Sequence, residues 1–219
     1  MLLKPLTKPK LLVTCEGMNP QCLPLWEATW DFIKNKHPKL KVTVFTIPFY
    51  KGEAENDVFR NKEFKRWHKE RKGWVDIVQL GYTHFNPECI RLSKPQYILL
   101  KRGYRKIGRY MSKKIYCFKP SFDRIGPYTD GVLTNLGFSA YLYHKSIVFL
   151  RTTNSDIEDF ILVKTRISFN EKHPDDISKL FKNISTYLTK MEKQKYSYTT
   201  FTNIVKNSIG GEVTSPKSS

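Results

Sequence analysis

The hydrophobic and polar positions of the chain follow two periods. Short apolar runs rich in β-branched residues predict strands, and segments with apolar residues three or four positions apart predict helices. The predicted strands are 11–15, 41–48, 74–80, 115–118, 140–143, 146–150 and 160–163. The predicted helices are 23–36, 61–72, 94–111, 129–136 and 175–193, and Gly137 is the expected left-handed cap of the fourth.

Strands and helices alternate along most of the chain. This order is typical of an α/β domain with a mostly parallel sheet. The 219 residues are enough for one sizeable domain, so we expect a single domain over 1–209 and a polar, frayed tail over 210–219. In such folds the chemistry lies at the carboxyl ends of the strands. The loops after Cys15, Ile47, Leu80 and Phe118 are therefore the candidates for a site.

Three of these loops carry polar groups with catalytic chemistry. Glu16 follows the first strand, His84 lies in the loop after the third, and Lys119 follows the next one. A general base beside a metal or an oxyanion-stabilising group is what a hydrolytic site needs. Each residue also has a structural interpretation, since a carboxylate often complements a helix N-terminus and a loop histidine is often only hydrogen-bonded.

The amino-acid sequences of these segments resemble those of a known family. LLVTCEGMNP, KVTVFTIP, WVDIVQLGYTHFNPEC, FKPS and LGFSAY together look like a polysaccharide deacetylase of the NodB-homology class, from about Leu11 to Leu188. The resemblance implies a distorted (β/α) barrel of about seven mostly parallel strands. It also implies metal-dependent removal of an acetyl group from an N-acetylated sugar. In that chemistry one aspartate is the base, and a second aspartate and two histidines hold the metal.

The sequence departs from the family at two of the three metal ligands. The aspartate pair of the family falls on Glu16 and Gly17, so the base is retained as a glutamate and one ligand is lost. The histidine pair falls on Leu80 and His84, so only one imidazole remains. A single imidazole holds a divalent ion weakly, because catalytic zinc sites supply three protein ligands.

Two further departures concern positive charge. The arginine of the family falls on Lys119, which keeps the charge but loses the bidentate fork. The catalytic histidine at the end of a late strand is replaced by Lys164 or Arg166. The resemblance therefore assigns Glu16 and Lys119 to the catalytic positions. It leaves His84 as a metal ligand, with Glu88 or Asp123 as substitutes, and a zinc-like ion is expected only if the ligand set has been rewired in this way.

The four cysteines (Cys15, Cys22, Cys89 and Cys117) form no CxxC pair. A zinc ribbon is therefore excluded, and reduced thiols in an intracellular, cytoplasmic protein are expected. Cys15 is a candidate nucleophile beside Glu16, but we expect its side chain to point into the barrel as a small apolar filler. No apolar stretch reaches the length of a membrane-spanning helix, and the N-terminus lacks the pattern of a signal peptide.

The charge of the chain changes the functional picture. Lys and Arg number 38 against 20 Asp and Glu, giving a formal charge of +18. The segment 101–114 contains seven basic residues and no acidic one, and a second basic cluster covers 62–72. Such segments are either solvated helix faces or contacts for an anionic polymer, that is, an acidic glycan or a nucleic acid. The predicted polymer-binding residues are Lys101, Arg102, Tyr104, Arg105, Lys106, Arg109, Tyr110, Lys113 and Lys114.

The functional hypotheses follow from these observations. The leading one is a divergent polysaccharide-deacetylase-like protein with an eroded metal site, which binds an anionic or N-acetylated polymer with weak or no hydrolysis. The alternatives are a basic nucleic-acid-binding or host-interaction protein on a reused barrel scaffold, and an active carbohydrate N-deacetylase with rewired ligands. The sequence does not fix the oligomeric state.

Overall fold

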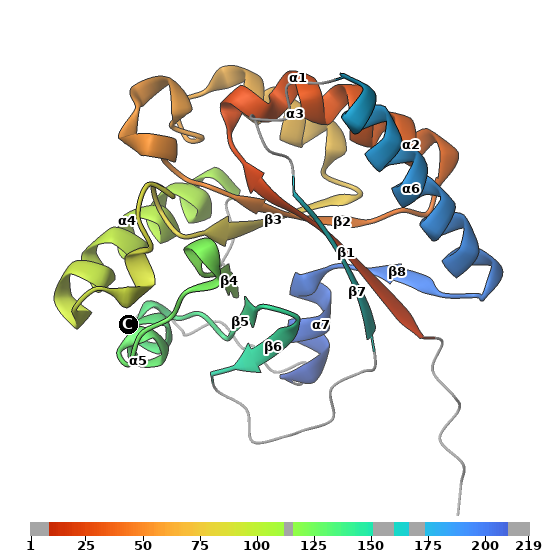
Figure 1. Ribbon diagram of the computed structural model, residues 1–219. Coiled ribbons are helices and arrows are strands. Elements are labelled where there is room, and N and C mark those ends of the chain that lie inside the picture. Colours follow the sequence, from red (N-terminus) through yellow and green to blue (C-terminus); the bar gives the residue numbers. More distant parts are fainter. Residues whose placement is uncertain (1–8, 112–115, 151–159, 167–173, 210–219) are drawn as a thin grey trace, which may run out of the picture.

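A curled, mostly parallel sheet forms the centre of the molecule (Figure 1). The computed structural model describes residues 9–111, 116–150, 160–166 and 174–209. In this part of the chain the sheet has eight strands, seven of them in the order β6-β5-β4-β3-β2-β1-β7. β8 pairs with the first residues of β1. All pairs are parallel except the β5–β6 hairpin.

The strands agree closely with the predicted ranges. They are β1 (Lys10–Met18), β2 (Val42–Thr46), β3 (Val75–Leu80), β4 (Cys117–Lys119), β5 (Ala140–Tyr143), β6 (Ser146–Phe149), β7 (Phe160–Arg166) and β8 (Ser197–Thr199). The predicted distorted (β/α) barrel is confirmed as a curled half-barrel with a mostly parallel sheet.

The helices are α1 (Leu23–Trp26), α2 (Phe32–Lys36), α3 (Lys62–Arg71), α4 (Ser93–Met111), α5 (Thr129–Leu136), α6 (Pro174–Lys193) and α7 (Phe201–Ser208). α5 ends at Gly137, whose φ of 90° is the left-handed conformation expected for this cap. No described helix combines the length and the apolar character needed to cross a bilayer.

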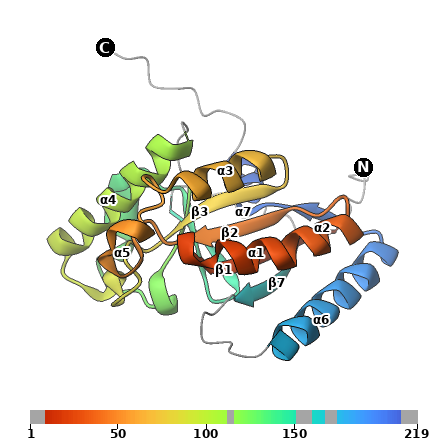
Figure 2. The same ribbon diagram turned by 90° about the horizontal axis from the view of Figure 1, so that it is seen from above.

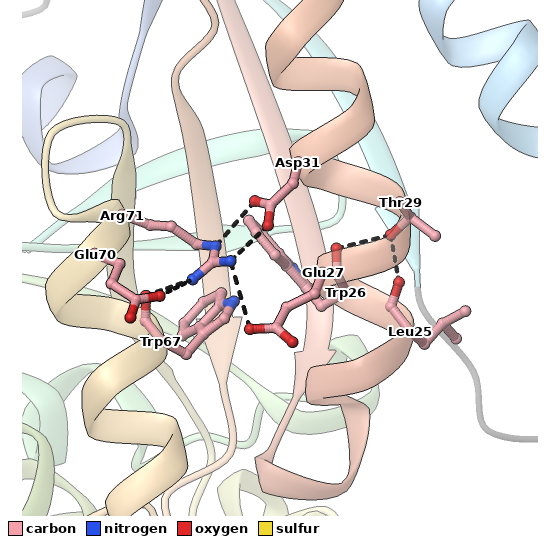
Figure 3. Close-up of polar contacts among 8 residues, drawn as sticks. All are labelled: Leu25, Trp26, Glu27, Thr29, Asp31, Trp67, Glu70 and Arg71. Atoms are coloured by element: carbon pink, nitrogen blue, oxygen red, sulfur yellow. Dashed lines mark hydrogen bonds and ion pairs between the residues drawn. The ribbon is translucent and has the colours of Figure 1, made fainter.

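The first predicted helix is interrupted. A wider π-helical turn, Glu27–Asp31, joins α1 to α2. The hydroxyl of Thr29 donates to the carbonyl oxygens of Leu25 at 2.6 Å and Trp26 at 3.0 Å (Figure 3). A threonine hydroxyl bound to the carbonyls of the preceding turn commonly distorts a helix, so hydrophobic spacing alone could not reveal this turn.

Residues that alternate along the strands divide the core into two layers. The outer layer lies between the sheet and helices α1 to α6, and includes Trp26, Trp30 and Trp67. The inner layer lies on the concave face of the sheet, where Phe45 packs against Phe201 with ring centroids 6.2 Å apart. Figure 2 shows helices α1, α2, α3 and α4 lying across one face of the sheet.

β8 and α7 were not predicted from the sequence. Their sequence is mostly polar, but Thr200 caps α7 by accepting a hydrogen bond from the backbone N–H of Asn203. The backbone N–H of Phe201 donates to Oγ1 of Thr43 at 2.9 Å, which anchors α7 at the amino ends of the strands. The predicted tail 210–219 lies outside the described residues.

Candidate functional site

A cavity of about 200 Å³ opens at the carboxyl ends of β1, β3 and β4. Its lining residues are Glu16, Gly17, Leu80, His84, Phe122 and Asp123. The structure thus brings Glu16 and His84 together, as expected from the convergence of parallel strand ends. Gly17 has a φ of 89° and lies at an irregularity in the pairing of β1 with β2, so β1 ends there in a bulge.

Lys119 lies beside this cavity, between two carboxylates. Cys117 packs in the inner core layer and Phe118 in the outer one, so alternation along β4 points Lys119 inward. Its Nζ lies 3.8 Å from Oε1 of Glu16 and forms a close ion pair with Asp123, and the lysine side chain is only 1% exposed. Burial of an ammonium is unfavourable unless carboxylates compensate it, and these two acids do so.

A strained turn brings Asp123 to Lys119. Phe122 has a φ of 59° and Asp123 a φ of 51°, a left-handed conformation that is uncommon outside glycine. Oδ1 of Asp123 also accepts a hydrogen bond from the backbone N–H of His144 at 3.2 Å. Contacts on both sides of the turn therefore stabilise its strained backbone. Such strain is frequent at functional sites.

His84 adopts a left-handed conformation as well, with a φ of 56°. Its ring stacks on that of Phe122, with centroids 4.3 Å apart and planes 12° from parallel. This contact joins the loop after β3 to the loop after β4 and forms one wall of the cavity.

Glu88 fixes the backbone that presents His84. Its Oε1 accepts hydrogen bonds from the backbone N–H groups of Tyr82, Thr83 and His84 at 3.3, 2.8 and 3.0 Å, and from the hydroxyl of Thr83 at 3.1 Å. Glu88 is 1% exposed and is not among the residues that line the cavity. The structure therefore places this candidate ligand in a supporting position.

The close packing around Glu88 explains the glycine that precedes this loop. A Cβ added to Gly81 would lie 2.0 Å from Oγ of Ser121 and 2.8 Å from Oε2 of Glu88. Gly81 also has a φ of 49°. Both the limited space and the conformation require glycine.

The donor set of the cavity does not fit a catalytic divalent ion. Leu80 and Gly17, which stand at two ligand positions of the resemblance, offer no donor side chain, and the two carboxylates face the ammonium of Lys119. In the described part of the chain no three His, Cys, Asp or Glu side chains are grouped as a metal site. Catalytic zinc sites normally supply three such ligands.

β7 supplies the remaining position of the resemblance. The backbone of Lys164 is paired with Thr14, and that of Arg166 with Glu16. The side chains of these two β7 residues lie outside the described part of the structure, so their predicted role stays a prediction.

The prediction for Cys15 is wrong in its direction. Cys15 is fully buried, but it packs in the outer core layer with Leu11 and Val13. Glu16 turns to the cavity, and successive residues of a strand face opposite sides, so Cys15 must point toward the helices. All four cysteines are buried, and burial raises the pKa of Cys22 to about 12, which keeps that thiol protonated at neutral pH.

The predicted polymer-binding residues divide between two faces of α4. Arg102, Arg105, Lys106 and Arg109 line a hollow of about 420 Å³, together with Phe59, Arg60 and Tyr82. Lys101 instead donates to the Tyr97 hydroxyl at 3.1 Å, and Tyr104 packs edge-to-face on Phe138 at 5.3 Å. The side chain of Tyr110 and all of Lys113 and Lys114 lie outside the described residues.

The basic cluster 62–72 is partly compensated by acidic neighbours. The guanidinium of Arg71 bonds Asp31 at 2.9 and 2.5 Å, and it contacts Glu27 at 3.4 Å and Glu70 at 3.1 Å (Figure 3). The hydrogen bond to Asp31 raises the pKa of Arg71. Arg71 therefore links α3 to the helical segment before β2, and its guanidinium has a structural role.

Comparison with solved structures identifies the fold at low sequence identity. The CE4 (family 4 carbohydrate esterase) domain of a multidomain xylanase from the hindgut metagenome of Trinervitermes trinervoides superposes with a TM-score of 0.60 at 11% identity, over 91% of this chain and 90% of that one. A family 4 carbohydrate esterase from Bacillus anthracis gives 0.58 at 14% identity, over 91% and 83%.

A CE4 family pseudoenzyme from Bacillus anthracis is also similar. Its wild type gives a TM-score of 0.54 at 16% identity, over 92% of this chain and 66% of that one, and a mutant with restored enzymatic activity gives 0.58 at 17%, over 92% and 69%. No family model matches the sequence, and no curated protein does so. The chain therefore shares the deacetylase-type fold of enzymes and of a pseudoenzyme.

Proposed function

On this fold, we propose that the protein is a non-hydrolytic, deacetylase-like protein that binds an anionic polymer. The observation that carries the proposal is the buried ammonium of Lys119, which faces Glu16 and Asp123 beside a cavity whose other ligand positions are Leu80 and Gly17. The positive charge that a divalent ion would supply in this cavity is supplied instead by the ammonium of Lys119.

The same arrangement limits Glu16 as a general base. A general base must take a proton from water, whereas Oε1 of Glu16 faces the ammonium of Lys119 at 3.8 Å. Nζ of Lys119 is also turned toward the two acids, so it is not presented for nucleophilic attack. The described residues of this cavity thus argue against turnover there.

The distribution of charge supports an anionic ligand. The chain carries a formal charge of +18, and α4 presents exposed arginines beside a hollow, whereas Arg71 on α3 is engaged by carboxylates. A positive surface of this kind attracts polyanions over a distance of about 10 Å at moderate salt.

Metal analysis and acetate release test the proposal together. Protein purified without chelators and then dialysed against zinc or cobalt should retain far less than one ion per chain. It should also release no acetate from N-acetylglucosamine oligomers or acetylated xylan. A stoichiometric, tightly held ion with acetate release would instead establish the active deacetylase with rewired ligands.

A further inference from the structure

The hollow beside α4 is a second candidate site, separate from the cavity at the strand ends. We call it the arginine pocket; its lining residues are Phe59, Arg60, Tyr82, Arg102, Arg105, Lys106 and Arg109, and its volume is about 420 Å³. Arg60 comes from the segment before α3, Tyr82 from the loop after β3, and the other cations from α4. Three separate parts of the chain therefore converge on it.

Helical spacing explains why α4 contributes a row of cations. Arg102, Arg105 and Arg109 are three and four positions apart, so they lie on one face of the helix. At 1.5 Å per residue this row extends for roughly 10 Å along α4. A row of that length can contact several charges of a linear polyanion at once.

The charges of the arginine pocket are incompletely compensated. Asp57, 3% exposed, forms a close ion pair with Lys106 and lies 4.0 Å from Nε of Arg60. Within the described residues, Arg102, Arg105 and Arg109 make no hydrogen bond or ion pair, and all three are exposed. Asp57 thus holds the base of the pocket together, while three guanidinium groups remain available to a ligand.

We propose that the arginine pocket binds the phosphate groups of a nucleic-acid backbone, independently of sequence. This inference rests on the proposed function, because it names the polymer and the place where it binds. Guanidinium groups match phosphate oxygens in bidentate geometry. Several of them around one hollow favour a polymer with a charge on every unit, whereas acidic glycans commonly carry a carboxylate on only some of their sugars.

The aromatic residues of the pocket indicate that the backbone is recognised rather than the bases. Tyr82 is 6% exposed, and its ring packs on Phe49 with centroids 5.8 Å apart. One face of the partly buried Phe59 ring is occupied by Nζ of Lys65, 5.0 Å from the ring centroid. Base stacking needs an open aromatic face, so contacts to phosphate remain as the main source of affinity, and binding should depend steeply on salt.

Fluorescence anisotropy with a labelled 20-nucleotide DNA of mixed sequence, as a single strand and as a duplex, tests this inference. The test variant is Arg102→Gln/Arg105→Gln/Arg109→Gln. The matched control is Lys179→Gln/Lys182→Gln/Lys190→Gln on α6, where all three lysines are exposed, so that net charge falls equally. At 100 mM salt the arginine variant should bind at least about ten times more weakly than the control, with a salt slope smaller by about 2.

The outcomes separate this inference from the proposed function. Equal loss in both variants would overturn the inference, because only net charge would then matter. Tighter binding to a carboxylated glycan such as hyaluronate than to DNA, unchanged in the arginine variant, would also overturn it while leaving polymer binding intact. Acetate release with a bound metal would refute the proposed function but would not change the difference between the two variants.

Discussion

Nζ of Lys119 lies 3.8 Å from Oε1 of Glu16, where the ends of β4 and β1 converge on one cavity. The same ammonium pairs with Asp123 from the following turn. Three side chains from two segments thus form one unit, in which two carboxylates compensate a buried ammonium.

Removing the ammonium should destabilise the fold. Lys119→Met leaves Glu16 and Asp123 facing each other without their cation. We expect the free energy of unfolding to fall by about 3 kcal/mol, as is typical when one partner of a buried pair is lost. Urea denaturation measures the change, and Lys190→Met on the surface of α6 is the control. A loss below about 1 kcal/mol would show that the unit contributes little.

Restoring the missing donors should restore metal binding. Gly17→Asp/Leu80→His places a carboxylate and an imidazole beside His84, giving the three ligands that a divalent ion requires. Since Gly17 has a φ of 89°, the substitution should cost about 1 kcal/mol of stability. Cobalt absorption spectra and titration calorimetry should show a Kd at least 100-fold lower than for the wild type. The same affinity in Leu80→Asn alone would contradict this explanation.

Glu88 should be essential for the loop that carries His84. Glu88→Ala leaves the backbone N–H groups of Tyr82, Thr83 and His84 without their acceptor, which should cost about 3 kcal/mol. Glu88→Gln keeps one acceptor oxygen and should cost less. Hydrogen exchange of these amides reports the effect locally, with the exposed Glu55→Ala as a control. Unchanged protection in Glu88→Ala would disprove the role.

Alkaline pH should weaken the fold through Tyr198. Burial and the hydrogen bond from its hydroxyl to Glu192 at 2.9 Å raise the pKa of Tyr198 in the folded state. The unfolded chain then loses this proton first, so the stabilisation is complete below about pH 10 and declines as the pH rises further. Melting temperatures between pH 8 and 11 should fall less steeply in Tyr198→Phe than in the wild type. Identical slopes would exclude Tyr198 as a cause.

The cysteines should be inert in the native protein. Burial raises the pKa of Cys22 to about 12 and also raises that of Cys89. A disulfide reagent at pH 8 should label all four thiols at least 100-fold more slowly in the folded protein than in urea, because the thiolate is the reactive species. Rapid labelling of Cys15 in the native state would revive it as a nucleophile.

The strand ends were the predictable part of the site. Glu16 and His84 follow apolar runs, and parallel strands necessarily bring their carboxyl ends together. The pairing of Lys119 with Asp123 was not predictable in the same way, because it depends on left-handed conformations at Phe122 and Asp123 that no glycine marks in the sequence.

Only part of the arginine pocket could be predicted from the sequence. The basic run on α4 was evident, but Arg60 and Tyr82 lie more than 15 residues before it in the sequence, and only folding brings them to the same hollow. The opposite case is Arg71, which belongs to the second basic cluster, 62–72, and is neutralised by Asp31 and Glu27 from a different segment. Charge along the sequence does not show which cations the fold already uses.

α7 gives the half-barrel the form of a cup rather than a tube. Phe201, Ile204 and Val205 fill the concave face of the sheet, and Thr43 and Asp76 near the amino ends of β2 and β3 bind the first turn of α7. A long chain molecule therefore cannot thread through the described part of the protein. On the proposed function such a molecule would lie across the rim, where the loop after β3 carries His84 on the cavity side and Tyr82 in the arginine pocket.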